Sequence, residues 1–251
     1  MNYVIIGNSA AAIGAVEGIR KYDREGSITL ISDEPYHTYS RPLISYYLAG
    51  KVSEEKMLYR KPDFYASNGV EAILGVKAES VTVSEQTVTL ADGRVIQYDK
   101  LLLATGGRPF VPGNLDVAKE RVYSFIKLDD VKAIEKVAKP GSKAVIIGAG
   151  LIGLKAAEGL AKLGVDITVV ELANRVLSAI LDEEAASYVQ ESLEKHDIKF
   201  ELNTTASEIL GRDKVTGVNL TNGKQLDCDF LIVAIGVVPN TGLVMDTGIK
   251  V

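Results

Sequence analysis

Two stretches of the chain share one pattern of apolar and polar positions. Each opens with an apolar run that ends at a glycine, Val4–Gly7 in the first stretch and Val145–Gly148 in the second. Apolar residues at helical spacing follow, and then a second apolar run, at residues 28–31 or 167–170. A strand, a helix and a strand in this order predict a β-α-β unit with parallel strands. The sequence therefore predicts two units of the same design in one chain.

The two halves also end alike. An aspartate, an apolar strand and an Ala-x-Gly sequence close each of them, at Ala104–Gly106 and at Ala234–Gly236. Before each closing strand, β-branched residues flank a turn dipeptide, Asp92-Gly93 or Asn222-Gly223, which is typical of a hairpin. The predicted fold class is therefore α/β, with two Rossmann-like parallel-sheet domains that each carry a β-meander.

Proline and glycine interrupt the pattern at residues 109–113, which we take as the join between the halves. A helix is expected at residues 129–138, ahead of the second core strand. We expect a first domain at residues 1–110, with a short return segment at 241–251, and a second domain at residues 111–240.

The second glycine loop is a complete G-x-G-x-x-G between a strand and a helix. Gly148 allows the tight turn, Gly150 lets a pyrophosphate approach the backbone, and Gly153 lets the helix pack on the strand. The start of the helix offers free N–H groups and the positive end of its dipole to phosphates. This loop predicts a dinucleotide site with contacts from Gly148, Gly150, Leu151, Ile152 and Gly153.

An acidic residue completes the second site. Glu171 ends the strand after the helix, where a carboxylate accepts hydrogen bonds from the adenosine ribose. A 2′-phosphate there would meet like-charge repulsion, so NAD(H) is expected over NADP(H). Arg175 lies nearby in the sequence and would soften that preference.

The first glycine loop departs from the pattern. In Gly7-Asn8-Ser9-Ala10-Ala11-Ala12, Ser9 and Ala12 replace the second and third glycines. Both residues are small, so a pyrophosphate can still approach. Ser32 stands at the place that matches Glu171, and two carboxylates follow it. The expected contacts are Gly7, Ser9, Ala10, Ala11, Asp33 and Glu34.

Composition narrows the function classes. Hydrophobic residues make up 47% and charged residues 24% of the chain, which is typical of a soluble globular protein. The net charge of −5, without any basic run, argues against nucleic acid as a partner. The apolar runs are too short for a membrane span, and the N-terminus enters a strand pattern instead of a signal peptide. The cytoplasm is the expected location.

Few residues suit nucleophilic or metal chemistry. The chain has one cysteine and two histidines, without metal-ligand spacing, so no metal is expected. Cys228 precedes a strand and is expected to be a small apolar filler. His37 is expected to be a loop residue and His196 to be solvated. Hydride transfer between cofactors needs no protein acid, so no catalytic side chain is predicted.

The motifs together resemble the two-dinucleotide flavoproteins of the pyridine nucleotide-disulphide oxidoreductase family. The resemblance covers essentially the whole chain and rests on residues 4–12, 103–109, 148–153 with Glu171, and 229–240. It implies that the first unit binds FAD, that the second binds NAD(P)H, and that a hydride passes between them. It assigns to cofactor binding also Lys77, Ala78, Ala104, Thr105, Gly106, Arg108, Ala234, Ile235 and Gly236.

The branch of the family is indicated by residues 39–50. Disulfide-using members carry a redox cysteine there, whereas this chain has Pro42 at that position. Arg41-Pro42 is similar to NADH:rubredoxin and ferredoxin reductases and to the N-terminal part of assimilatory nitrite reductase. This implies FAD contacts from Arg41 and Pro42, and an electron-carrier protein as acceptor. Two departures from the family pattern are Tyr46 in place of a lysine and Lys155 in place of a glutamate.

Family members continue past the position of Asn240 with an Ala-Gly-Asp segment and a C-terminal domain. The resemblance therefore implies that the chain is a fragment, that its FAD binding is weakened, and that any oligomer forms through the missing part. The leading function is an NADH-dependent FAD reductase of an electron carrier such as rubredoxin or ferredoxin. The alternatives are an NADH oxidase or a peroxide or disulfide reductase, and a nucleotide-binding module without turnover.

Overall fold

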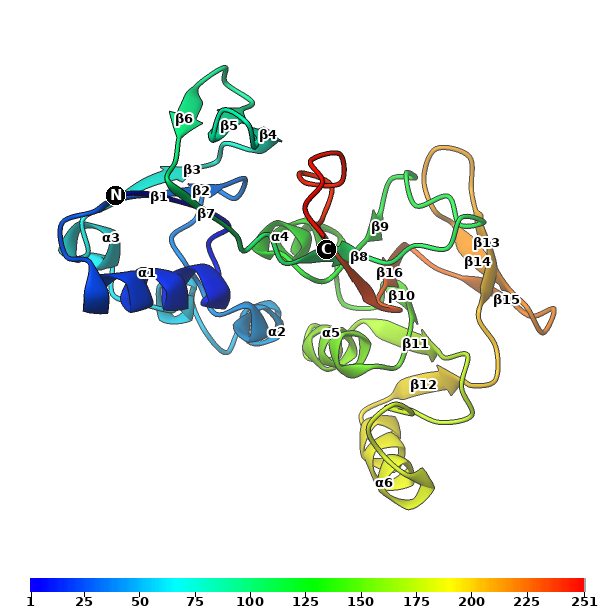
Figure 1. The fold of residues 1–251 in the computed structure, drawn as a ribbon. Coiled ribbons are helices and arrows are strands. Elements are labelled where there is room, and N and C mark those ends of the chain that lie inside the picture. The colour runs from blue at the N-terminus through cyan, green and yellow to red at the C-terminus, as the bar shows by residue number, and fades with distance from the viewer. Residues whose placement is uncertain (251) are drawn as a thin grey trace. The chain divides into compact units, whose positions relative to one another are not determined.

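The computed structural model describes residues 1–250, and the chain divides into two compact units. The first unit comprises residues 1–40, 54–108 and the segment from Pro239 onward; the second comprises residues 41–53 and 109–238. Figure 1 labels their elements. Among the helices of the described residues, none has the length and apolar character needed to cross a membrane.

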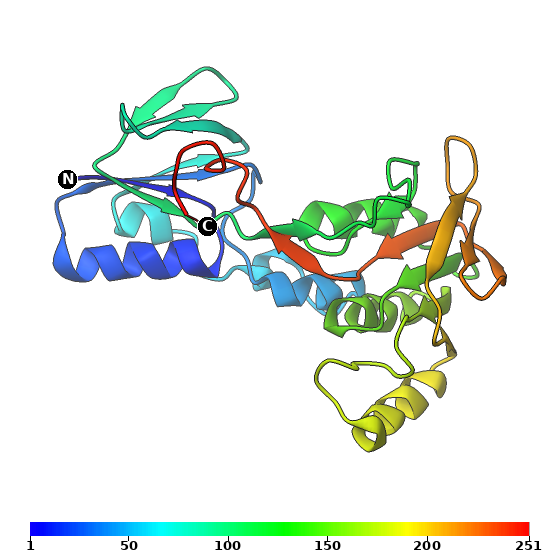
Figure 2. The ribbon, with the colours of Figure 1, turned by 45° about the vertical axis from the view of Figure 1, so that its right-hand side comes forward.

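The first unit is built on a four-stranded parallel sheet in the order β3-β2-β1-β7. A three-stranded antiparallel meander, β4-β5-β6, lies on one face of this sheet, and α1 and α3 lie on the other (Figures 1 and 2). The elements are β1 (Asn2–Ile6), α1 (Ala10–Tyr22), β2 (Ser27–Ser32), η2 (Glu54–Met57), α3 (Phe64–Ser67), β3 (Val70–Leu74), β4 (Ala78–Thr82), β5 (Thr87–Leu90), β6 (Val95–Gln97) and β7 (Lys100–Leu103).

The second unit repeats this design around a five-stranded parallel sheet in the order β12-β11-β10-β16-β9, with the meander β13-β14-β15. Where the chain passes between the units, β8 (Gly107–Pro109) pairs with β17 (Val237–Pro239). The remaining elements are η1 (Arg41–Leu43), α2 (Ile44–Leu48), β9 (Val122–Tyr123), α4 (Leu128–Val137), β10 (Lys143–Ile147), α5 (Leu151–Ala161), β11 (Asp166–Val170), α6 (Glu183–Glu194), β12 (Ile198–Glu201), β13 (Ala206–Leu210), β14 (Gly217–Leu220), β15 (Gln225–Asp227) and β16 (Phe230–Val233).

The core strands read as unbroken apolar runs because both faces of each sheet are covered. Successive side chains of a strand point to opposite faces. In β1, Val4 and Ile6 therefore join the cluster under the meander, whereas Ile5 joins the cluster under α1 with Ile13 and Val16. This alternation explains why β1 lacks the polar positions of a half-exposed strand.

The predicted fold class, the repeat and both hairpins are confirmed. Each hairpin turn has its glycine in the left-handed region, with φ of 86° at Gly93 and 85° at Gly223. The glycine N–H donates to the carbonyl of the last residue of the preceding strand, Leu90 or Leu220. Glycine suits these turns because a Cβ disfavours this backbone conformation. The helix expected at residues 129–138 is α4.

The structural division differs from the expected one at residues 41–53. This segment groups with the second unit, where α2 packs against α5. A Cβ on Gly159 of α5 would lie 3.2 Å from both the Leu48 side chain and the Ser45 carbonyl oxygen. The glycine therefore permits this close approach of the two helices. The return segment, expected at residues 241–251, groups with the first unit from Pro239 onward.

Cys228 is the buried filler expected from its sequence context, with 6% of its surface exposed. Burial raises the pKa of its thiol to about 12, and the nearby charges of Asp229 and Asp227 add to this shift. Since the thiolate is the reactive form, we predict that a thiol reagent at pH 8 labels the native protein far more slowly than the urea-unfolded protein. Absorbance of the released reagent group measures both rates. Complete labelling of the native protein within the mixing time would contradict this assignment.

Candidate dinucleotide sites

Two of the three glycines in the second loop are required by packing. Gly148 has a φ of 106°, and a Cβ there would lie 2.4 Å from the carbonyl oxygen of Ala234. A Cβ on Gly153 would lie 2.0 Å from the carbonyl oxygen of Gly148. Both distances are too short for any side chain. The loop thus turns tightly against the end of β16, and α5 begins directly against the loop.

The middle glycine has a different environment. Gly150 is the N-cap of α5, with an ordinary φ of −77°, and a Cβ there would meet no protein atom within 4 Å. Gly150, Leu151 and Ile152 are exposed. The first N–H groups of a helix have no partner within it, and they attract anions. The space beside Gly150 and the start of α5 therefore suit a phosphate group.

Glu171 closes the second loop from the end of β11. Its Oε2 accepts a hydrogen bond from the Ala149 N–H over 2.7 Å, and its Oε1 accepts one from the Ala173 N–H over 2.9 Å. The carboxylate is half-buried and retains lone pairs for a hydroxyl ligand. Arg175 donates to the carbonyls of Ser178 and Leu181, so its guanidinium is engaged within its own loop.

The first loop uses the same turn as the second. Gly7 has a φ of 129°, and a Cβ there would lie 2.1 Å from the carbonyl oxygen of Ala104. Ala104 and Ala234 thus serve the same purpose in the two halves, which explains the repeated Ala-x-Gly sequence. Ser9 is the N-cap of α1, and Ala12, at the third glycine position, is completely buried.

Helix caps distinguish α1 and α5, which follow the two loops, from the other two long helices. The longer helices outside the loops are capped by aspartates: Asp182 accepts from the Ala185 N–H in α6, and Asp130 accepts from the Lys127 N–H in α4. In the described residues, Ser9 and Gly150 provide no such side-chain bond for α1 and α5. The exposed starts of α1, at Ala10 and Ala11, and of α5 are therefore available to a ligand.

The acidic residues after β2 have different surroundings. Glu34 is buried, and its Oε2 accepts a hydrogen bond from the Tyr39 hydroxyl over 2.6 Å. Asp33 is exposed. Ser32, at the position matching Glu171, accepts from the Glu34 N–H through its Oγ over 3.2 Å. Of the two acidic residues expected to contact the first cofactor, Asp33 is thus the exposed one.

The Ala-x-Gly sequence of the first half is tied to the return segment. Thr105 Oγ1 donates to the Asn240 carbonyl over 2.8 Å, and Asn240 Nδ2 donates to the Thr105 carbonyl over 2.9 Å. The Asn240 N–H also donates to Gly106. The sequence pattern indicated Asn240 as the end of the closing motif of the second half and did not predict its bonds to Thr105.

The other predicted contacts are more dispersed. Arg41 lies in η1 of the second unit and donates to the Ile126 carbonyl over 3.2 Å. Pro42 follows it and accepts from Ser45 Oγ. Lys77 directly precedes β4, and Ala78 is the first residue of β4 and is buried. Arg108 is exposed in β8, whereas Ile235 and Gly236 follow β16, with a φ of 143° at Gly236.

The two departures from the family pattern meet in the second unit. The Lys155 ammonium lies 5.3 Å from the centroid of the Tyr46 ring, and so does that of Lys51. Lys155 also pairs with Glu158 over 2.7 Å, which holds the pKa of the Glu158 carboxyl below its usual range. The tyrosine is therefore packed against cations, which is favourable for an aromatic ring.

A polar cluster beside the first loop was not predicted. The side chains of Asn8 and Tyr65 are hydrogen-bonded to each other and to the backbone of residues 36–38. The His37 ring lies 4.6 Å from the Tyr65 ring, and its Nε2 is buried without a partner among the described residues. His37 is thus the expected loop residue, and His196 is exposed as expected. In the sequence, only the neighbouring aromatic residues Tyr36, His37 and Tyr39 indicated a cluster in this region.

Comparisons with known proteins agree with this geometry. A nitrite reductase (NAD(P)H) from Bacillus subtilis (strain 168) is 33% identical over 249 residues, covering 99% of this chain and 31% of the relative. A rubredoxin-NAD(+) reductase from Pseudomonas putida is 29% identical over 253 residues, covering 100% and 66%. The crystal structure of a covalent putidaredoxin reductase-putidaredoxin complex matches with a TM-score of 0.90 at 30% identity, covering 100% and 62%.

The chain spans less than two thirds of the length of each of these relatives. The family model described as pyridine nucleotide-disulphide oxidoreductase matches residues 1–251. The predicted family is confirmed, and with it FAD and NAD(H) as the cofactors that members of the family bind. With its doubled fold, its two glycine loops and this match in agreement, the chain belongs to the pyridine nucleotide-disulphide oxidoreductase family.

Proposed function

We propose that this chain binds FAD at the first glycine loop and NADH at the second, and that it passes reducing equivalents from NADH to an electron-carrier protein. The observation that carries the proposal is the shared geometry of the loops. In each, a glycine with positive φ turns against an alanine carbonyl, and the following helix begins without a side-chain cap. Both helix starts then suit a pyrophosphate.

The residues proposed for each site follow from this geometry. The second site uses the space at Gly150, the N–H groups at the start of α5 and the carboxylate of Glu171. The first uses the corresponding N–H groups of α1 beside Ser9, with Asp33 as an exposed acid. Bound FAD would accept the hydride of NADH and release electrons singly, so the contribution of the protein is mainly to bind and orient.

NADH is proposed as the better donor because of Glu171. Its carboxylate is fixed by two backbone N–H groups at the end of β11, where it would repel a 2′-phosphate. The nearest arginine in the sequence, Arg175, is occupied by backbone carbonyls of its own loop. We expect NADPH to bind more weakly than NADH in a direct titration, and equal affinity would contradict this preference.

An electron carrier is proposed as the acceptor because this chain lacks the thiol chemistry of the disulfide-using branch. Pro42 stands at the position of the redox cysteine, and Cys228 is buried with a raised pKa. The similarity to a rubredoxin reductase and to a putidaredoxin reductase bound to putidaredoxin supports the same class of acceptor.

The test is a sequence of anaerobic additions to the protein loaded with FAD. NADH is added first, and the flavin absorbance band is expected to bleach. Oxidised rubredoxin or ferredoxin is then added, and the band is expected to return. Recovery only with oxygen or peroxide would replace the carrier with an oxidase or peroxidase function. Failure to bleach, with both nucleotides bound, would indicate a nucleotide-binding module without turnover.

A further inference from the structure

The hydroxyl of Tyr65 joins three segments of the first unit. It donates a hydrogen bond to Asn8 Oδ1 over 2.7 Å and accepts one from the Thr38 N–H over 3.0 Å. Asn8 in turn donates through Nδ2 to the carbonyl of Tyr36 over 3.0 Å. These bonds connect residues 36–38 to α3, α3 to the first glycine loop, and that loop again to residues 36–38. Bonds in such a chain strengthen one another.

The position of Asn8 makes this chain of bonds important for the loop. Asn8 lies between Gly7, which forms the turn, and Ser9, which is the N-cap of α1. Its amide oxygen and its amide nitrogen are both bonded to other segments, so the side chain holds the loop and does not extend into solvent. The direction of the first free N–H groups of α1 therefore depends on where Asn8 is held.

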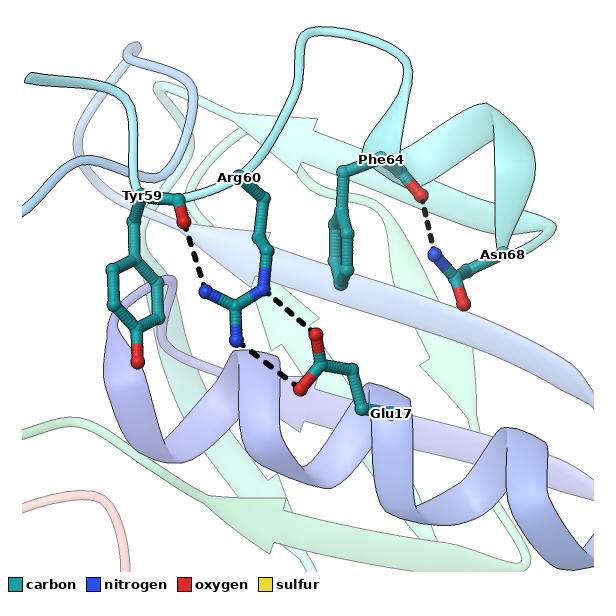
Figure 3. Close-up of polar contacts among 5 residues, drawn as sticks. All are labelled: Glu17, Tyr59, Arg60, Phe64 and Asn68. Carbon is teal, nitrogen blue, oxygen red and sulfur yellow. Dashed lines mark hydrogen bonds and ion pairs between the residues drawn. The ribbon is translucent and has the colours of Figure 1, made fainter. Parts of the chain in front are cut away.

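The segment that carries Tyr65 is anchored without its hydroxyl. Figure 3 shows the Arg60 guanidinium on both carboxylate oxygens of Glu17 in α1, at 2.7 and 3.2 Å. Phe64 is buried under the sheet with Ile13 and Val16, and its carbonyl accepts from Asn68 Nδ2. Removing the Tyr65 hydroxyl should therefore loosen the glycine loop without detaching α3.

We propose that Tyr65 is a positioning residue for the first dinucleotide site: through Asn8 it holds the glycine loop in the conformation that receives the pyrophosphate of FAD. The inference rests on the proposed function, since it concerns the site proposed for FAD. Tyr65 is half-buried, and burial raises the pKa of its hydroxyl, so it remains a donor throughout the neutral pH range.

The experiment compares the affinity for FAD of the wild type with that of Tyr65→Phe, which keeps the ring and removes only the oxygen. Titration of flavin fluorescence gives the Kd. Loss of two hydrogen bonds should raise the Kd for FAD about tenfold, with the Kd for NADH unchanged. Tyr59→Phe is the matched control: it makes the same change on the same segment, in a ring that is 37% exposed and contacts Arg60.

Asn8→Ala tests the same contact from its other end and is informative if Tyr65→Phe folds poorly. If the two side chains act together, Asn8→Ala/Tyr65→Phe binds FAD no more weakly than the weaker single variant. Independent losses, which multiply in the double variant, would overturn the inference. So would an unchanged Kd for Tyr65→Phe, or an equal loss in Tyr59→Phe. If the wild type itself binds no FAD, the proposed function is refuted. If the wild type binds FAD and Tyr65→Phe binds it equally well, only the role of Tyr65 is refuted.

Discussion

Replacing Gly150 with alanine is expected to weaken NADH binding at least about tenfold while leaving the free energy of unfolding within about 1 kcal/mol of the wild-type value. An alanine accepts the φ of −77° at this position, and its Cβ meets no protein atom within 4 Å. The methyl group instead occupies the space through which the pyrophosphate would approach the start of α5. Titration calorimetry with NADH, together with urea unfolding, measures both quantities.

Gly153→Ala is the matched comparison on the same loop. Its Cβ would lie 2.0 Å from the carbonyl oxygen of Gly148, so α5 must move. Overpacking of this kind costs about 1–3 kcal/mol. Gly153→Ala should therefore lower the stability of the protein, whereas Gly150→Ala should lower its affinity. Tight NADH binding by a stable Gly150→Ala protein would place the pyrophosphate elsewhere and refute this reading of the loop.

Gly7→Ala is expected to destabilise the first unit by about 3 kcal/mol and to remove FAD binding. The new Cβ would lie 2.1 Å from the Ala104 carbonyl oxygen, and a φ of 129° is itself unfavourable for alanine. The two nearest atoms are the carbonyl oxygen and carbon of Ala104, directly after β7, and these backbone atoms cannot yield as a flexible side chain would. Differential scanning calorimetry of the apo protein measures the loss.

Alanine at Gly14 provides the control for the first unit. Gly14 lies within α1, and a Cβ there would meet nothing within 4 Å. This change should stabilise the helix by about 1 kcal/mol, because alanine has the higher helix propensity. If Gly7→Ala and Gly14→Ala had the same effect on melting, the close approach of Gly7 to Ala104 would not be a determinant of the fold.

Local patterns were sufficient to predict the two units. The strands that carry Val4 and Val145 follow from unbroken apolar runs, and both hairpins follow from glycine-containing turn dipeptides. The tight turn at Gly148 and the close helix packing at Gly153 follow from the spacing of the glycine motif, although Gly148 also turns against Ala234, which is distant in the sequence. Short-range rules of this kind depend on steric limits that every chain shares.

Sequence patterns did not predict the contacts between distant residues that hold the sites in place. Tyr65 lies 57 residues from Asn8, and no sequence motif around either residue predicts that the two side chains are in contact. The packing of α2 on α5 depends on Gly159, whose role is visible only when Ser45 and Leu48 are placed beside it. Arg41 likewise bonds to Ile126, 85 residues away. Such pairings depend on the assembled fold and not on local propensity.

The central claim, hydride transfer from NADH to FAD in an oriented site, is tested most directly with stereospecifically deuterated NADH. The protein loaded with FAD is mixed anaerobically with NADH that carries deuterium at either the pro-R or the pro-S position of the nicotinamide C4, and bleaching of the flavin band is followed in a single turnover. The account predicts slower bleaching with one of the two isotopomers and an unchanged rate with the other, because a fixed ring presents one hydrogen. Absence of bleaching, or equal rates with both isotopomers and with unlabelled NADH, would contradict it.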